Sequence, residues 1–245
     1  MNENNNFGNS EPNTMAMAVN RLSEYGLVIR GDFVPHRSDN IPFVSKGVET
    51  QSVLLVGNNN RRMWQVFQSS EIYKFKSDRR TQEPLDQWTR DVVGQVAGEL
   101  SARAIYPFDG PPYFPFLKWA HRAEPVSTSP LGLTIHPTYG LWHAYRAALL
   151  FADPIQFPRQ SEVESPCHSC TDQPCLSGCP VGAFSEGRYD VPKCIAHLTS
   201  SEDIECKKKG CLARHSCPVG TSYVYGSEQA QFHMDAFVKS VVEQD

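Results

Sequence analysis

All eight cysteines of this 245-residue chain lie between Cys167 and Cys217, in the last third of the sequence. The first group follows the spacing Cys-x2-Cys-x4-Cys-x3-Cys-Pro and runs from Cys167 to Cys179. The second group consists of Cys194, Cys206, Cys211 and Cys217, and both groups end in the tetrapeptide Cys-Pro-Val-Gly. Closely spaced thiolates are ligands for soft metal ions and iron–sulfur clusters. The cysteine block therefore predicts metal or redox chemistry.

The first group resembles the cysteine run of bacterial two-cluster ferredoxins, with two additional residues between the second and third cysteines. In that run three thiolates hold one cluster, and the fourth cysteine, which precedes a proline, serves the other cluster. The resemblance implies two [4Fe–4S] clusters with crossed ligands, although the second group departs from the usual tight spacing. The first cluster would take Cys167, Cys170, Cys175 and Cys217. The second would take Cys179, Cys194, Cys206 and Cys211.

Two other arrangements of the eight cysteines are open. They could form two zinc sites, because Cys-x2-Cys is also a zinc-binding pattern. They could form four disulfides, which would require an oxidising compartment. The Cys-Pro ending of both groups favours clusters over zinc.

Composition and the N-terminus bear on where the protein works. Hydrophobic residues make up 40% and charged residues 20% of the chain, which is ordinary for a globular protein with a sizeable core. No apolar run approaches the length that crosses a bilayer, and residues 1–14 lack the features of a secretory signal. We expect residues 1–14 to be a disordered tail, and the protein to be cytoplasmic with no membrane partner. The net charge of −4 gives no indication of a nucleic-acid partner.

The cysteine-free part of the chain must fold by itself around an apolar core. Residues 84–103 predict the clearest helix, because apolar side chains recur there every four residues. Residues 27–34, 53–56, 131–135 and 145–151 predict strands. Strands and helices together predict an α+β sandwich over residues 15–155. A ferredoxin-like domain over residues 160–225 and a C-terminal helix over 226–245 would follow.

One string in the front part resembles a segment of a known family. Residues 135–146, Ile-His-Pro-Thr-Tyr-Gly-Leu-Trp-His-Ala-Tyr-Arg, resemble the I-H-P-x-x-G-x-W-x-x-x-R segment of cobalamin-processing proteins of the cblC type. Epoxyqueuosine reductases resemble more of the chain, because a related domain precedes a two-cluster ferredoxin module there in the same order. Their C-I-S-Y-L-T segment is similar to residues 194–199, Cys-Ile-Ala-His-Leu-Thr. The resemblance implies a nitroreductase-like domain that holds a corrinoid next to a dicluster ferredoxin-like domain.

The resemblance also implies roles for individual residues. Asp109, in a Gly-Pro loop similar to that of the epoxyqueuosine enzymes, would be a general acid above the cofactor. Its alternative role is that of a turn aspartate that accepts hydrogen bonds from its own backbone. Contacts to corrin or substrate would come from His136, Tyr139, Trp142 and Arg146. These side chains could equally be packed residues of the core or a strand edge.

These expectations combine into a corrinoid-dependent reductase. An external donor of the ferredoxin or flavodoxin type would pass electrons through two [4Fe–4S] clusters to a cobalamin. The reaction would be cobalamin reduction, removal of its upper ligand, or reduction of a small substrate. The alternatives are a non-enzymatic electron carrier and a zinc-binding interaction module. The glycine-lysine string and the C-terminal helical repeats of epoxyqueuosine reductases are not found here, which argues against a tRNA substrate.

Overall fold

The computed structural model describes residues 11–75, 83–155, 163–185, 187–201 and 203–243. The chain divides into two compact units, each built from several segments. The front unit contains the described residues of segments 11–58, 62–124 and 144–155. The cysteine unit contains those of segments 59–61, 125–143 and 163–243. Each unit is described by itself below.

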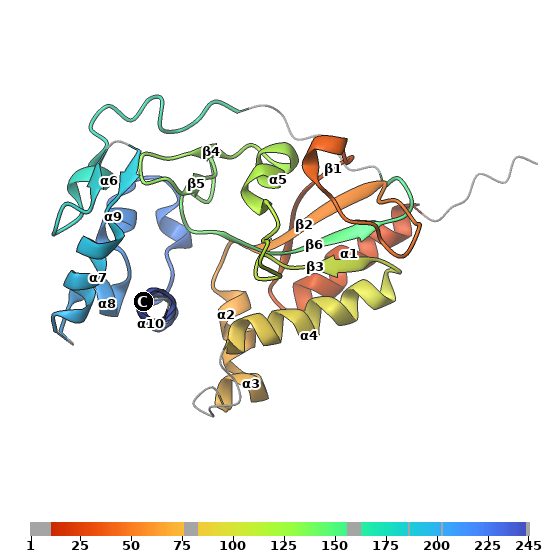
Figure 1. Cartoon of the computed structure of the whole chain (residues 1–245), viewed down its shortest axis with the longest axis horizontal. Helices are drawn as coiled ribbons and strands as arrows, with labels where there is room; N and C mark the ends of the chain where they lie inside the picture. The colour runs from red at the N-terminus through yellow and green to blue at the C-terminus, as the bar shows by residue number, and fades with distance from the viewer. Residues whose placement is uncertain (1–10, 76–82, 156–162, 186, 202, 244–245) are drawn as a thin grey trace, which may run out of the picture. The chain divides into compact units, whose positions relative to one another are not determined.

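A four-stranded antiparallel sheet forms the centre of the front unit, in the order β1-β2-β6-β3 (Figure 1). The strands are β1 (Val28–Phe33), β2 (Ser52–Asn58), β6 (Ala144–Phe151) and β3 (Arg103–Ile105). Every residue of β2 is buried, since this strand lies between two neighbours and is covered on both faces. Its run Val-Leu-Leu-Val is continuous rather than alternating for the same reason. The strands predicted at 27–34, 53–56 and 145–151 are confirmed.

Helices cover this sheet. Figure 1 shows α1 (Glu11–Glu24) and α4 (Pro84–Glu99) on one side of it and α5 (Phe116–Ala123) on the other. The remaining short elements of the unit are η1 (Arg37–Asp39), α2 (Arg62–Gln68) and α3 (Glu71–Lys74). The predicted helix over 84–103 ends earlier, at Glu99, because Ser101 takes a left-handed conformation before β3 begins. Residues 1–10 of the predicted tail lie outside the described residues, and α1 already includes Glu11 onward.

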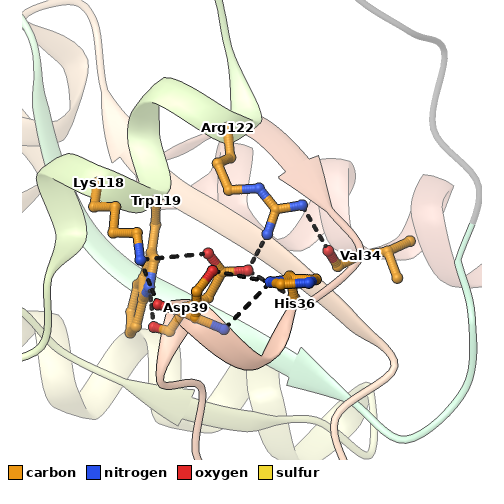
Figure 2. A network of polar contacts seen from close by, with 7 residues as sticks. Val34, His36, Asp39, Lys118, Trp119 and Arg122 are labelled. Atoms are coloured by element: carbon orange, nitrogen blue, oxygen red, sulfur yellow. Dashed lines mark hydrogen bonds and ion pairs between the residues drawn. The ribbon is translucent and has the colours of Figure 1, made fainter.

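A buried carboxylate holds η1 against α5 (Figure 2). The side chain of Asp39 is 1% exposed and forms an ion pair with Arg122 of α5. Its Oδ2 also accepts a hydrogen bond from the backbone N–H of His36 at 2.7 Å, which caps η1. The indole N–H of Trp119 donates to the Asp39 carbonyl at 2.9 Å. One charge thus fixes a turn and a helix to each other beside the sheet.

A second buried ion pair joins β1 to the end of α5. Arg30 and Glu124 have side chains only 1% and 2% exposed, and two Arg30 nitrogens bind the carboxylate at 2.7 and 3.2 Å. The Tyr145 hydroxyl, on β6, donates to the same carboxylate. Burial raises the pKa of Glu124, while Arg30 and Tyr145 act in the opposite direction. The carboxylate depends on these partners because water does not reach it.

The cysteine unit consists of several short helices, one longer C-terminal helix and two small hairpins. Its strands are β4 (Ser127–Thr128), β5 (Thr134–Ile135), β7 (Phe184–Ser185) and β8 (Arg188–Tyr189). Its helices are α6 (Pro174–Ser177), α7 (Val191–Thr199), α8 (Glu205–Lys209), α9 (Leu212–His215), η2 (Thr221–Tyr223) and α10 (Ser227–Val242). The predicted C-terminal helix is therefore α10, and it packs on α7 and α8 of this unit. Across the described ranges, no helix combines the length and apolarity that a bilayer crossing needs.

The boundary predicted between the two parts differs from the observed one. The predicted front domain, residues 15–155, includes residues 125–143, whereas the structure groups these residues with the cysteine unit. The physical reason is packing, since Leu131, Ile135 and Leu141 share one apolar cluster with Cys175 and Cys217. The sequence pattern indicates apolar residues in segment 125–143, but it does not indicate whether they pack in the core of the front unit or of the cysteine unit.

The buried ion pair leads to a test of stability. Replacing Glu124 by Gln should lower the free energy of unfolding by about 3–5 kcal/mol, because Arg30 would stay buried without a counter-charge. The matched control is Glu99→Gln. Glu99 also holds an arginine through two contacts, to Arg21, but at the surface.

We expect the control to lose far less, because water screens an exposed pair. Urea unfolding followed by tryptophan fluorescence measures both variants. Similar losses for the two substitutions would contradict the role given to the buried pair.

Candidate functional site

The first cysteine cavity has a volume of about 20 Å³ and is lined by four of the eight cysteines. These are Cys167, Cys170, Cys175 and Cys217. Three come from the loop and short helix α6 that follow residue 166, and the fourth follows α9. Most of the remaining lining is apolar, including Ile135, Leu141 and Val219, with Ser129 and Gln173 as polar members. Cysteines 42 to 50 positions apart in sequence, counted from Cys217 to the other three, therefore face one small space.

The second cysteine cavity is larger, about 330 Å³, and is lined by the other four cysteines. These are Cys179, Cys194, Cys206 and Cys211. Helix α7 carries Cys194, α8 carries Cys206, and Cys211 directly precedes α9. Rings and aliphatic side chains complete the lining, among them Phe184, Tyr189 and Phe237. The chain thus crosses over, because Cys179 of the first sequence group lies at the second cavity and Cys217 at the first.

The thiols of each cavity influence one another. Cys217 raises the pKa of both Cys167 and Cys175 at the first cavity. Cys179 raises the pKa of both Cys194 and Cys206 at the second cavity. These effects need short separations, since the interaction of charges falls with distance. The cysteines that raise one another's pKa are therefore the same cysteines that share a cavity.

Burial sets the protonation state of these thiols. It is the largest cause of a raised pKa at Cys167, Cys175, Cys194, Cys206, Cys211 and Cys217. For Cys211 it raises the pKa to about 11. Such thiols are protonated and weakly nucleophilic at neutral pH. They become thiolates when a bound cation displaces their protons, so the set is suited to metal ligation rather than thiol exchange.

All eight cysteines are free thiols, so the four-disulfide arrangement is not found. Within the described ranges, no three His, Cys, Asp or Glu side chains converge closely enough to hold a single metal ion. The four thiols of each cavity line it without such a convergence among the described residues.

The string that resembles cblC-type proteins is divided between the units. His136, Tyr139 and Trp142 lie in the cysteine unit, whereas Arg146 lies on β6 of the front unit. The rings of His136 and Tyr139 stack with centroids 4.2 Å apart. Nδ1 of His136 accepts backbone N–H bonds from Thr138 at 3.0 Å and Tyr139 at 3.3 Å. These two hydrogen bonds stabilise the turn that starts at His136.

Trp142 is a core residue of the cysteine unit, only 1% exposed. The Arg214 guanidinium lies 4.3 Å from its ring centre and also donates to the Leu141 carbonyl. Arg214 lies on α9, between Cys211 and Cys217, so it ties the 136–143 segment to the cysteine-bearing helices. The sequence analysis does not single out Arg214, although its position between two cysteines of the second group is a signal that could have identified it.

Arg146 is half-buried and donates from Nε to the Asn58 side chain at 3.2 Å. It also lowers the pKa of Asp86 in the first turn of α4, which burial raises more strongly. Arg146 is therefore placed among polar groups of the front unit.

Asp109 lies in the turn that follows β3. Its carboxylate accepts a hydrogen bond from the Tyr106 backbone N–H at 3.0 Å and pairs with Arg90 at 2.8 Å. The Arg90 guanidinium also lies over the rings of Tyr106 and Phe108, 4.7 and 5.0 Å from their centres. These contacts match the turn-aspartate role that was open at this position.

The fold defines a mixed α+β protein with likenesses among solved structures. The B12-trafficking protein CblC of C. elegans, a homologue of human MMACHC, matches with TM-score 0.54 and 14% identity, over 91% of this chain and 91% of that chain. An epoxyqueuosine reductase in complex with an epoxyqueuosine-modified tRNA-Tyr stem loop matches with TM-score 0.50 and 15% identity, over 88% and 67%. At these identities the likeness shows a shared fold. No protein-family model and no curated protein matches the sequence.

The close approach of two backbone segments behind the first cavity can be tested. Gly140 has a positive φ of 57°, and a Cβ there would clash with the Val219 carbonyl, two residues after Cys217. Gly132 also has a positive φ, 76°, but a Cβ there meets no atom within 4 Å. The two glycines thus separate backbone strain from steric contact.

Gly132→Ala should cost about 1 kcal/mol of unfolding free energy, which is the strain of a left-handed residue with a side chain. Gly140→Ala should cost a further ~3 kcal/mol, because the cysteine-bearing loop would have to move. Urea unfolding of the two variants under identical anaerobic conditions measures the difference. Equal costs would show that segments 139–140 and 219–220 do not pack as described.

Proposed function

We propose that each cysteine cavity holds one [4Fe–4S] cluster and that the protein is a corrinoid-dependent reductase. The observation that carries the cluster assignment is the lining of each cavity by four buried or half-buried thiols. These two sets are the crossed ligand sets expected for a two-cluster ferredoxin module. A zinc site needs its ligands converging on one ion, whereas a cluster needs them spread around a larger body.

Polar groups beside the cavities fit a cluster as well. Ser129 lines the first cavity, is 6% exposed, and its hydroxyl has no hydrogen-bond partner among the described residues. A cluster sulfide would accept a hydrogen bond from that hydroxyl. At the second cavity the Ala183 backbone N–H already donates to Cys179 Sγ at 3.2 Å. Donors aimed at cluster sulfurs stabilise added negative charge.

When bound, such clusters carry single electrons at low potential, as reduction of a cobalt centre requires. The work of this chain is to supply eight thiolates and to keep water away with apolar linings. An external donor of the ferredoxin or flavodoxin type would provide the electrons. The proposal places the protein in the cytoplasm, where free thiols persist, and without a membrane or nucleic-acid partner.

The corrinoid part of the proposal rests on the fold shared with a B12-trafficking protein. His136, Tyr139, Trp142 and Arg146 are the proposed corrinoid or substrate contacts, and Asp109 is the proposed general acid. Burial of Trp142 and the turn contacts of Asp109 favour structural roles for these two residues. The reaction would be cobalamin reduction, upper-ligand removal, or reduction of a small substrate. The second candidate is a ferredoxin-type electron carrier, and it would show the clusters without the corrinoid.

The cluster assignment predicts how iron is lost. Anaerobically prepared protein should contain about eight iron and eight sulfide per chain. Cys175→Ala should remove about four irons from the first cavity, and Cys206→Ala should remove the other four from the second. Iron and acid-labile sulfide assays measure both variants. Stoichiometric zinc in folded, colourless protein would contradict the assignment and favour the interaction module.

The corrinoid assignment predicts a spectral response. Cobalamin added anaerobically at micromolar concentration should shift its visible bands in the presence of the protein, because the axial environment of cobalt changes. Replacing Arg146 with Ala should weaken the response, while the exposed Arg188 on β8 offers the matched control. An unchanged cobalamin spectrum in protein that carries both clusters would leave the carrier as the better account.

Asp109→Asn separates the two roles of that residue. As a general acid, Asp109 is needed for turnover, and the variant should be inactive with both clusters intact. As a turn residue, Asn would keep most of the backbone hydrogen bonding and the activity. Turnover with reduced cobalamin present, measured together with iron content, distinguishes these outcomes.

A further inference from the structure

The second cavity differs from the first in the charge of its lining. Arg214, on α9, lines the second cavity beside Cys206 and Cys211. Apart from the cysteines, the polar members of the first cavity's lining are Ser129 and Gln173, and both are neutral. Among the described residues that line either cavity there is no Asp, Glu or Lys. An arginine charge therefore lies at the second cavity and not at the first.

The guanidinium of Arg214 is held in a fixed place. It lies over two buried rings, 4.3 Å from the ring centre of Trp142 and 4.8 Å from that of Tyr225. Its Nε donates to the Leu141 carbonyl at 3.0 Å, and its Nη2 donates to the same oxygen. Contacts with two aromatic faces and a carbonyl keep the charge from turning out into the solvent.

This cation has no carboxylate partner. Within the described ranges, no Asp or Glu pairs with Arg214, and the Leu141 carbonyl accepts its side-chain hydrogen bonds. Arg30 of the front unit is also held inside the protein, but the Glu124 carboxylate binds it at 2.7 Å. A positive charge that is partly withdrawn from water is stabilised by a nearby negative charge. For Arg214, that negative charge would come from the occupant of the cavity that it lines.

We propose that Arg214 makes the cluster of the second cavity the more easily reduced of the two. This inference rests on the proposed clusters. A [4Fe–4S] cluster held by four thiolates is already an anion, and reduction adds one further negative charge. A fixed positive charge attracts the reduced form more strongly than the oxidised form, so it raises the reduction potential. Electrons from a donor would accordingly reduce the second cluster before the first.

A potentiometric titration of the full-length protein, followed by electron paramagnetic resonance, tests this proposal. Wild-type protein should show two different potentials. In Arg214→Gln the higher one should fall, because reduction of that cluster becomes about tenfold less favourable, which is about 59 mV for a one-electron couple. The lower potential should move much less, since Arg214 does not line the first cavity.

Arg188→Gln is the matched control. Arg188 is an exposed residue of β8 and directly precedes Tyr189, which lines the second cavity. Water and salt screen a charge in that position, so both potentials should stay as in the wild type. His197 also lines the second cavity, but every protein in the comparison keeps it, and it therefore does not account for a difference between them.

Two further replacements separate charge from packing. Arg214→Lys keeps the positive charge but loses the planar fork, and it should retain most of the wild-type potential. Citrulline at position 214 keeps the length and the planar shape of arginine but is neutral, so it should lower the higher potential as glutamine does. The citrulline protein also supplies the measurement if Arg214→Gln fails to hold its second cluster.

Several results would overturn the proposal. They are a single common potential in the wild type, a fall of the lower potential instead of the higher one, and unchanged potentials in the glutamine or citrulline protein. An equal fall in the lysine and glutamine proteins would also overturn it, because the effect would then follow packing rather than charge. If wild-type protein carries no cluster at all, the proposed function fails, and this is seen before any variant is compared.

Discussion

The arrangement of the cysteine unit depends on the crossing of its chain between two cavities. Cys179 ends the first sequence group but lies at the second cavity, and Cys217 returns from the far end to the first. Neither cavity is complete without a residue from the other group. Both cavities therefore form only when this part of the chain folds as one unit. Helices α6 to α9 are short, and the core around which they pack consists of the apolar residues that line the cavities.

The segment 125–143 provides much of that apolar support. Leu131, Ile135 and Leu141 pack with two of the cysteines, and Trp142 packs with Tyr225 and Ala230 of the same unit. Arg214 adds polar contacts to this segment from the helix between Cys211 and Cys217. The string that resembles cobalamin-processing proteins is thus the stretch where the chain leaves one unit and enters the other. Residues 135–143 of this string pack in the cysteine unit, whereas residues 144–146 begin β6 of the front unit.

Much of this could be predicted from residue types and spacing. The two sets of four cysteines follow from the ferredoxin-like run, and the strands of the front sheet follow from apolar, β-branched segments. The end of α4 and the placement of 125–143 could not be predicted, because they depend on tertiary packing and on a left-handed residue at Ser101. Ser129 was missed, because an isolated hydroxyl forms no motif and acquires a role only beside a cavity. For Asp109, the sequence allowed both roles, and the contacts with Arg90 and Tyr106 favour the turn.

The central proposal is that eight thiols hold two [4Fe–4S] clusters, four thiols to each cluster. Native mass spectrometry of anaerobically purified, full-length protein tests it most directly. The account predicts a chain that carries two additions, each with the mass of four irons and four sulfides, together with a half-loaded species that has lost one of them. Folded chain of bare mass, or chain with only two zinc ions added, would contradict the claim.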